Sequence, residues 1–439
     1  MRESRNIVRL EDARSVRTLC VLLAVSGALP FRAVPRALAI CSPAGWVPHF
    51  TSVINWTLRL GLSLLQGVVP IEEPWIAIVD ASIDVAIQKV LVVLRVPISA
   101  IAKRRGALTL QDAQCIGVRV ATTWTGESVY EALQEVFSQS GMPASILKDG
   151  GSDLKKAVVL INDRSQGQTI QVIADAGHAV ANALEDEYGE QSTFKKFVCL
   201  ISRGATKLRQ SALAFVAPPK LRSKGRFQGI TKLSDWAKRI LPLLGETGHT
   251  KPNTLAGRLR HFVPGLCRYR AFLEQFSVTC DVARDFLQVM KNEGFSPSTS
   301  KTAEELLRKL PEKGRFRQRM TLWLQAQSAC HKALGLGEMP MPVSTDIIES
   351  LFGKLKAAVA RNPKAEFNRI VLAIPTLCGT IAKQVIDQAL QDASHRDLET
   401  WQRQNVRPSQ WQARQAFHQG KLSPDMVPKS GELFWQEAA

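Results

Sequence analysis

Residues 75–96 read Trp-Ile-Ala-Ile-Val-Asp-Ala-Ser-Ile-Asp-Val-Ala-Ile-Gln-Lys-Val-Leu-Val-Val-Leu-Arg-Val, and this stretch decides the fold. It holds two runs rich in Val and Ile, 75–81 and 89–96, with a polar break between them. Short apolar runs that contain many β-branched residues are typical of strands. A third such run covers 115–122, so we expect three successive strands that pair as a meander.

The chain after this meander alternates between helical and extended patterns. Apolar residues recur at helical spacing over 126–138 and 152–161, which predicts two helices. Strands are expected over 144–148 and 169–174. The order of three strands, helix, strand, helix and strand predicts an α/β core with a mixed five-stranded sheet.

Three acidic residues lie at the ends of these elements. Asp80 ends the first apolar run, Asp149 follows the fourth expected strand in a Lys-Asp-Gly-Gly turn, and Glu349 lies in a helical stretch further on. Carboxylates that converge from separate elements can hold two divalent cations for phosphodiester cleavage. The pattern therefore favours Asp80, Asp149 and Glu349 as catalytic residues and as ligands of two Mg²⁺ or Mn²⁺ ions.

Each of these acids also has an ordinary interpretation, because Asp is common in turns after strands. Asp84 follows Asp80 by four residues, and Asp153 follows Asp149 by four, so both compete for the same role. We rank both lower. Asp84 would lie in a hairpin, and Asp153 would lie in the first turn of a helix, where an acid complements the helix dipole.

Charge is distributed unevenly along the 439 residues. Lys and Arg number 57 against 39 Asp and Glu, which gives a formal net charge of +18. Residues 191–330 alone hold 26 Lys and Arg and 9 Asp and Glu, an excess of +17. A field of this kind attracts polyanions. The pattern in this part of the chain is mainly helical, which predicts a basic α-helical insertion within the core.

The first 70 residues predict three short helices, over 8–25, 31–41 and 51–65, joined by tight turns. Such a unit is similar to a helix-turn-helix, although helical domains that bind no DNA share the pattern. Asn suits recognition of adenine, and Arg suits guanine or phosphate. Five residues of this unit are candidate DNA contacts: Arg32, Arg36, Ser52, Asn55 and Arg59.

Taken together, these stretches resemble those of DDE-type transposases of bacterial insertion sequences, over about residues 8–390. The resemblance rests on Ile78-Val-Asp-Ala-Ser, Lys148-Asp-Gly-Gly-Ser-Asp-Leu-Lys-Lys, Asp175-Ala-Gly-His-Ala-Val-Ala-Asn and Ile348-Glu-Ser-Leu-Phe-Gly-Lys. It implies a ribonuclease H-like core, interrupted by the helical insertion and preceded by a helix-turn-helix. It also implies cleavage at the DNA ends of an element and strand transfer of the 3′ ends into target DNA, by a homo-oligomer that joins two ends.

The resemblance implies the following division of the chain. The expected parts are a helix-turn-helix domain over 1–70, the first part of the core over 71–176, the insertion over 177–342, the rest of the core with a following helix over 343–395, and a polar tail over 396–439.

Further candidate residues lie in the insertion and beside Glu349. Basic side chains there could neutralise DNA phosphates: Arg315, Arg317, Arg319, Lys354 and Lys356. Trp236 and Trp323 fit either stacking on an unpaired base or a place in the core. His178 resembles the His of the C-x-x-H signature of related transposases, with Asp175 in place of Cys. It is equally compatible with a DNA contact and with capping or packing at a helix start, whereas Asp175 fits a helix N-cap better than a metal ligand.

Two further observations bear on the location of the protein. The eight cysteines show no C-x-x-C spacing, which favours buried free thiols in a reducing cytoplasm over zinc or disulfide frameworks. The apolar stretch 19–30 is too short to span a bilayer, so we expect no signal peptide and no membrane anchor. A cytoplasmic protein bound to the nucleoid is expected. Two other functions fit the same pattern: a catalytically inactive, transposase-derived DNA-binding protein, and a ribonuclease H-like nuclease of branched DNA.

Overall fold

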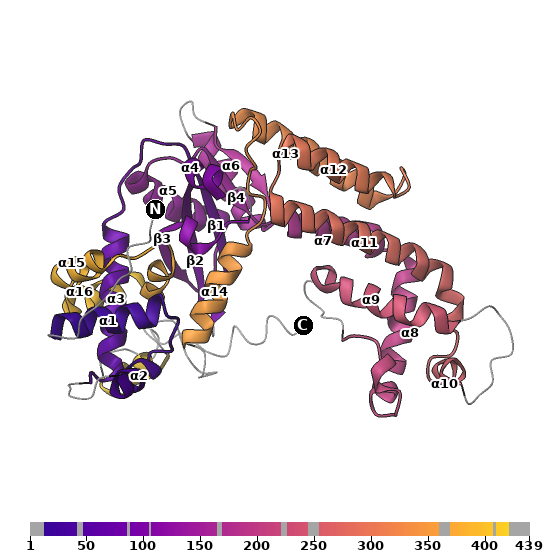
Figure 1. The fold of residues 1–439 in the computed structure, drawn as a ribbon, viewed down its shortest axis with the longest axis horizontal. Helices are drawn as coiled ribbons and strands as arrows, with labels where there is room; N and C mark the ends of the chain where they lie inside the picture. Colours follow the sequence, from indigo (N-terminus) through magenta and orange to yellow (C-terminus); the bar gives the residue numbers. More distant parts are fainter. Residues whose placement is uncertain are drawn as a thin grey trace.

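The centre of the molecule is a mixed five-stranded sheet with the strand order β3-β2-β1-β4-β5 (Figure 1). The computed structural model describes residues 13–41, 47–85, 88–104, 107–164, 169–220, 226–244, 254–359, 369–406 and 410–420. The strands are β1 (Trp75–Val85), β2 (Gln88–Pro97), β3 (Gln114–Ala121), β4 (Ser145–Lys148) and β5 (Gln171–Ala174). The first three are antiparallel neighbours, while β4 runs parallel to β1 and β5 parallel to β4. The predicted α/β core and its mixed five-stranded sheet are confirmed.

Helices cover both faces of the sheet. On one face, Ala77 and Val79 of β1 pack with α5 (Gly126–Ser140) and α6 (Ser152–Arg164). On the other face, Ile76 and Ile78 pack with helices from distant parts of the chain. These are α3 (Phe50–Gln66), α7 (Ala176–Tyr188) and α14 (Asp346–Val359). The short helix α4 (Ile98–Arg104) links β2 to β3. Because side chains alternate along a strand, Asp80 belongs to the face of Ile76 and Ile78.

The first part of the described chain is helical, as predicted, with α1 (Ala13–Val25) and α2 (Ala33–Cys41) packed against α3. These helices share a core with α15 (Lys383–Asp392), to which Ile386 contributes a fully buried side chain. The helix α3 also packs closely on the segment before α15. A Cβ atom at Gly61 would lie 1.6 Å from the carbonyl oxygen of Leu372, so only glycine fits there.

The chain after α14 differs from expectation in two ways. The single helix expected there is interrupted, because two 3₁₀ turns at 369–373 and 375–377 precede α15. Pro375 begins the second turn, and Gly379 has a φ of +71°, and both disfavour a continuous helix. The polar tail expected from residue 396 begins inside α16 (His395–Asn405), whose Leu398 is fully buried. A further helix, α17 (Gln410–His418), follows.

The chain between β5 and α14 is helical and extends away from the sheet (Figure 1). After α7 it forms α8 (Ser192–Arg209), α9 (Thr231–Ile240), α10 (Leu255–Phe262), α11 (Arg270–Glu293), α12 (Pro297–Arg308) and α13 (Arg315–Ala333). The helices α7 and α11 lead to a distal lobe of α8, α9 and α10. The helix α13 returns to the sheet, where Gln327 accepts a hydrogen bond of 3.3 Å from the backbone N–H of Ala174 at the edge strand β5.

Two expectations from the sequence, the absence of a membrane span and the burial of the cysteines, can be compared with the structure. None of the helices in the described ranges is long and apolar enough to cross a membrane. The seven cysteines that the structure describes are free, but only partly buried as expected. Cys199 is exposed and Cys267 is half-buried, whereas the buried ones are Cys20, Cys115, Cys280, Cys330 and Cys378.

Candidate active site

Asp80 and Asp149 lie where the pairing between β1 and β4 ends. Val79 of β1 is paired with Lys148 of the parallel neighbour β4, so Asp80 and Asp149 are the next residues on adjacent strands. Neighbouring strands in a sheet are about 4.8 Å apart. The strand pairing therefore brings these two candidate carboxylates close together.

The third candidate, Glu349, lies on the helix that covers this side of the sheet. The helix α14 contacts β1 and buries Ile348 and Leu351 in the same core as Ile78. Glu349 is in the first turn of α14 and is exposed. However, no three His, Cys, Asp or Glu side chains in the described ranges lie close enough together to hold one metal ion. The three acids share one side of the sheet without forming a closed ligand cluster.

Backbone N–H groups orient the two aspartates. Asp80 is 6% exposed, and its Oδ1 accepts a hydrogen bond of 2.6 Å from the N–H of Ala81. Asp149 is half-buried, and its Oδ1 accepts a bond of 2.9 Å from the N–H of Gly151. A Cβ atom at Gly151 would lie 2.9 Å from that same oxygen, so a larger residue there would shift the Asp149 carboxylate. The other oxygen of Asp149 accepts no hydrogen bond from the residues that the structure describes.

Asp175 is a buried carboxylate, 4% exposed, just after β5. It caps α7, because its Oδ1 accepts a hydrogen bond of 2.7 Å from the N–H of His178, and it lies 3.1 Å from Nδ1 of the His178 ring. Its Oδ2 accepts bonds of 2.8 Å from the N–H and 3.1 Å from the hydroxyl of Thr345. The N-cap role considered for Asp175 agrees with this geometry, and the contact with Thr345 was not anticipated.

Thr345 immediately precedes α14, so Asp175 joins the start of α7 to the start of the Glu349 helix. A second bond supports this junction, since the N–H of Ala176 donates to the carbonyl of Val343 over 2.8 Å. The chain thus leaves the core for the insertion and returns from it at one place. The position of α14, and with it Glu349, depends on this junction.

His178 belongs to the same neighbourhood as the aspartates. Its hydrogen bond with Asp175 raises the pKa of His178 above the ordinary value, and the negative charges of Asp149 and Asp80 raise it further. Burial raises the pKa of Asp175, but the hydrogen bonds from His178 and Thr345 outweigh this effect and leave it below its ordinary value. A histidine held near two acids in this way can carry a positive charge beside them.

Lys148 is a buried residue of this region that the sequence analysis did not single out. It is 5% exposed, and its Nζ donates a hydrogen bond of 3.3 Å to the carbonyl of Asp149. Burial lowers the pKa of Lys148 to about 8, and the nearby charge of Lys155 contributes to the decrease. The signal was present in the sequence, because a lysine that follows Ile146 and Leu147 in a short buried strand has a long side chain to accommodate.

The third N-terminal helix does not present all of its predicted DNA contacts. The guanidinium of Arg59 donates hydrogen bonds to the carbonyls of Leu390 and Ala393 at the end of α15. Its burial lowers the pKa of Arg59. Ser52 and Asn55 are half-buried. Arg59 therefore has a structural role, and we do not retain it as a DNA contact.

The remaining basic candidates fall into two groups. The arginines of α13 already bind the protein: Arg315 contacts the carbonyl of Asp186, Arg317 that of Leu310, and Arg319 the carboxylate of Asp186. The second group is exposed and comprises Arg32, which stacks on Phe50 at 4.8 Å, and Arg36, Lys354 and Lys356.

The two tryptophans considered for base stacking are core residues. Trp236 is fully buried, and its indole N–H donates a hydrogen bond of 2.8 Å to the carbonyl of Val216. Trp323 packs edge-on against Phe286 and Phe295. An exposed aromatic ring does occur in the insertion, at Phe215, which is 65% exposed.

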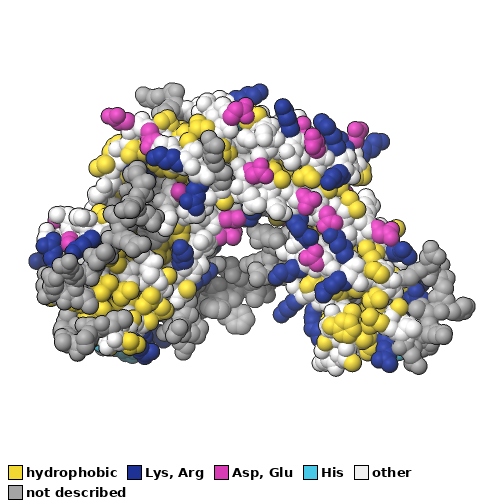
Figure 2. Space-filling model, in the orientation of Figure 1, with side chains coloured by type: hydrophobic (Ala, Val, Ile, Leu, Met, Phe, Trp, Pro, Cys, Tyr) yellow, Lys and Arg dark blue, Asp and Glu magenta, His cyan; other side chains and the backbone are white. Residues whose placement is uncertain are grey.

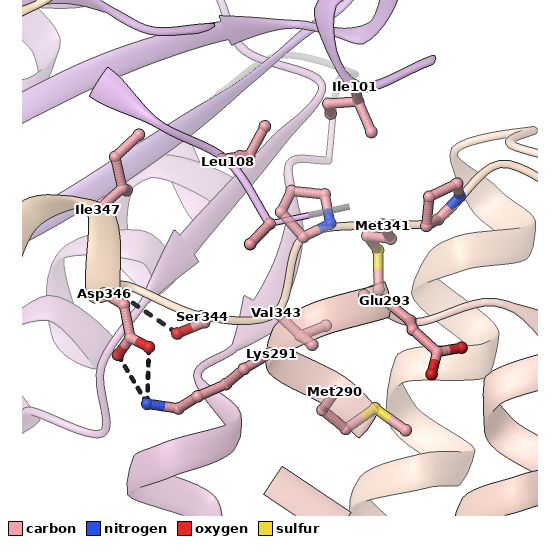
Figure 3. Close-up of a pocket in the computed structure, with 14 residues that line it drawn as sticks. Ile101, Leu108, Met290, Lys291, Glu293, Met341, Val343, Ser344, Asp346 and Ile347 are labelled. Carbon is pink, nitrogen blue, oxygen red and sulfur yellow. Dashed lines mark hydrogen bonds and ion pairs between the residues drawn. The ribbon is translucent and has the colours of Figure 1, made fainter. Parts of the chain in front are cut away.

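A small cavity of about 60 Å³ lies at the junction of the insertion and the core (Figure 3). Leu108, Met290 and Met341 contribute apolar walls, and Lys291 crosses one side to pair with Asp346 at 2.7 Å. The cavity is too small for a nucleotide. It marks the seam between α11 and the start of α14 rather than a substrate site.

Comparisons with known proteins give a likeness to solved structures but none at the level of sequence. No family model matches the sequence, and no curated protein does. Among solved structures, the chain is similar to the Drosophila P element transposase in its strand transfer complex. The two chains share 12% identity over 87% of this chain and 93% of the other, with a TM-score of 0.45. At this level no residue of one chain can be matched to a residue of the other.

Proposed function

We propose that this chain is a DNA transposase that binds the ends of an insertion sequence, cleaves phosphodiester bonds with divalent metal and transfers the 3′ ends into target DNA. One observation carries the proposal. Asp80 and Asp149 follow paired residues of parallel strands, on the side of the sheet that the Glu349 helix covers. Carboxylates from separate elements on one side of a sheet suit two-metal phosphodiester chemistry.

The donors available here suit Mg²⁺ or Mn²⁺, because hard divalent cations prefer carboxylate oxygens. One oxygen of Asp149 is free of hydrogen bonds from the described residues, and the exposed Glu349 side chain makes none with them either. We assign Asp80, Asp149 and Glu349 as the ligands of two ions. Such ions supply activation of the attacking hydroxyl or water and stabilisation of the leaving 3′ oxygen.

The protein's own contribution is to hold these side chains in place. Backbone N–H groups orient Asp80 within β1 and Asp149 directly after β4, and preorganised groups lose less free energy when they bind. His178, in its charged form, is suited to hold a DNA phosphate next to the acids, since Asp175 favours that form. Asp175 positions both His178 and the start of the Glu349 helix.

The partners follow from the same proposal. Double-stranded DNA supplies both the element ends and the target, and the net charge of +18 favours it. Joining two ends requires more than one active site, so we expect a homo-oligomer. The expected place of action is the cytoplasm, on the nucleoid.

Cleavage of DNA that carries the element ends tests the proposal. Purified protein with Mg²⁺ or Mn²⁺ should nick such DNA at the ends, and Asp149→Ala should lower the rate by at least about 10³-fold, since a metal ligand contributes several kcal/mol to the transition state. Asp153→Ala is the matched control, because Asp153 is an exposed acid in the next helix. This variant should cleave at the unaltered rate. Retained cleavage by Asp149→Ala would overturn the site assignment.

A second function is favoured by the open arrangement of the acids. The exposed Glu349 and the absence of a three-ligand cluster among the described residues also fit a transposase-derived protein that binds DNA without cutting it. Normal binding of the ends, with no cleavage at any Mg²⁺ or Mn²⁺ concentration, would establish that function. Cleavage of branched DNA without strand-transfer products would instead identify a nuclease.

A further inference from the structure

A continuous part of the insertion contains no acidic residue. Residues 191–234 hold 10 Lys and Arg and no Asp or Glu, whereas the chain as a whole has 57 basic and 39 acidic residues. A stretch of this length without a carboxylate cannot neutralise its own charge locally. Any face that it exposes is therefore a source of positive potential.

The helix α8 lies in this stretch and has two distinct faces. One face is buried in the lobe through Phe194, Phe197, Ile201 and Leu208. Gly204 lies on it as well, at a close contact where a Cβ atom would come 2.6 Å from the Val263 side chain. The helix is therefore fixed in rotation by its packing, and the opposite side is held towards solvent.

The exposed side of α8 carries Lys196, Arg203 and Lys207, which we call the α8 basic face. These residues are spaced by seven and four positions, so they line up along the helix within about 40°. The face spans about 16 Å, at a rise of about 1.5 Å per residue. None of the three side chains forms an ion pair or hydrogen bond with the described residues.

Other basic residues of the insertion differ in this respect. Arg319 pairs with Asp186, Lys238 with Asp281, and Arg284 with Asp235. Basic residues without a described partner also occur on α12, as Lys301 and Arg308, but Glu304 and Glu305 lie on the same helix, whereas residues 191–234 contain no acidic residue. Figure 2 shows Lys and Arg side chains over the lobe that contains α8 and along the edge that borders the hollow beside the sheet.

We propose that the α8 basic face binds the phosphate backbone of duplex DNA. This inference rests on the proposed function and names a surface for its substrate. A duplex carries one negative charge per about 1.7 Å of its axis, so a 16 Å face lies opposite several phosphates. Lys and Arg on a rigid helix reach such phosphates without reading the base sequence. The α8 basic face therefore contributes affinity for duplex DNA of any sequence.

The test measures binding of the full chain to a labelled duplex of random sequence between about 50 and 200 mM salt. The triple variant Lys196→Gln, Arg203→Gln, Lys207→Gln should bind roughly tenfold more weakly at about 100 mM salt. Its plot of log affinity against log salt should be shallower by about 2 to 3, since each lost phosphate contact removes about 0.9. Because all three positions are exposed, thermal unfolding should match the wild type and show that folding is intact.

Lys195→Gln is the matched control. Lys195 is adjacent to Lys196 on the same helix, but its Nζ already pairs with Glu190 at 2.6 Å, so its replacement should leave the salt dependence nearly unaltered. Equal affinities and slopes for the triple variant and this control would overturn the inference. Stronger binding of duplex RNA than of duplex DNA by the same face would overturn DNA as its partner.

Failure of this inference is distinguishable from failure of the proposed function. Asp149→Ala removes a proposed metal ligand and tests cleavage, whereas the triple variant tests binding of duplex DNA. Absence of cleavage by the wild-type protein, with normal binding, would remove the transposase proposal and leave the α8 basic face in place. Cleavage by the triple variant at the wild-type rate, together with unaltered DNA binding, would remove the α8 basic face and leave the transposase proposal in place.

Discussion

Asp175 is the residue on which the geometry of the candidate site depends most directly. Its two oxygens accept hydrogen bonds from His178 and Thr345, which are 167 residues apart in the sequence. Because it is buried, no water can replace a partner that is lost. The charge and both acceptor oxygens are therefore needed, which a neutral side chain of the same shape cannot supply.

Asp175→Asn tests this role. The amide NH₂ of Asn would face one of the N–H donors that an oxygen now accepts, and a buried donor without an acceptor costs about 1–3 kcal/mol. We expect the free energy of unfolding in urea to fall by about that amount. DNA cleavage should fall as well, because the start of the Glu349 helix would no longer be fixed.

Asp346→Asn is the control for this variant. Asp346 follows Thr345 directly, but its ion pair with Lys291 is largely exposed to solvent, and such pairs contribute at most about 1 kcal/mol. A loss of unfolding free energy in Asp346→Asn as large as that in Asp175→Asn would contradict the role of Asp175.

At the scale of single elements, α3 shows how a helix that looks suited to DNA serves the fold instead. Its Arg59 satisfies carbonyls at the end of α15, where helix C-termini carry partial negative charge. Removing the guanidinium leaves these acceptors without their partner. We therefore expect Arg59→Met to lower the free energy of unfolding by about 1–3 kcal/mol, measured by chemical denaturation of the full chain.

Arg36→Met provides the comparison within the same helical unit. Arg36 is exposed and has no partner among the described residues, so its replacement should change the unfolding free energy by less than about 0.5 kcal/mol. A stable Arg59→Met variant with altered DNA sequence preference would instead restore Arg59 as a base contact.

The sequence predicted those elements whose signals are local. The apolar alternation from Trp75 and the turn at Asp149 depend on neighbouring residues, so the strands and the place of Asp149 after β4 could be inferred. The end of β1 was wrong, because the strand continues past Asp80 to Val85 and Asp84 pairs with Lys89 of β2 instead of lying in a hairpin. Contacts across the chain could not, because no local pattern distinguishes an exposed arginine from one bonded to a carbonyl more than 330 residues away, as at Arg59. Trp323 was ambiguous for the same reason. Glu349 remains a candidate, since its approach to the other acids depends on such long-range packing.

At the scale of the whole molecule, the N-terminal helices and α15, which are far apart in the sequence, share one core. The helices α1, α2 and α3 enclose a core that also contains Ile381, Ile386 and Ala389. On its other side α3 buries Leu58 and Leu62 against the sheet. The helix α3 thus packs against the α15 region on one side and against the sheet on the other.

An isolated fragment of residues 13–70 should therefore fail to fold. A chain this short has little core of its own, and it would expose the apolar surfaces that now face α15 and the sheet. We expect its far-ultraviolet circular dichroism to show little helix and no cooperative thermal transition. Joining it through a flexible linker to residues 369–406 should restore helical signal, because Ile386 then returns to its site. The same fusion with Ile386→Asp should remain unfolded, whereas a cooperative transition in the isolated fragment would establish an independent domain.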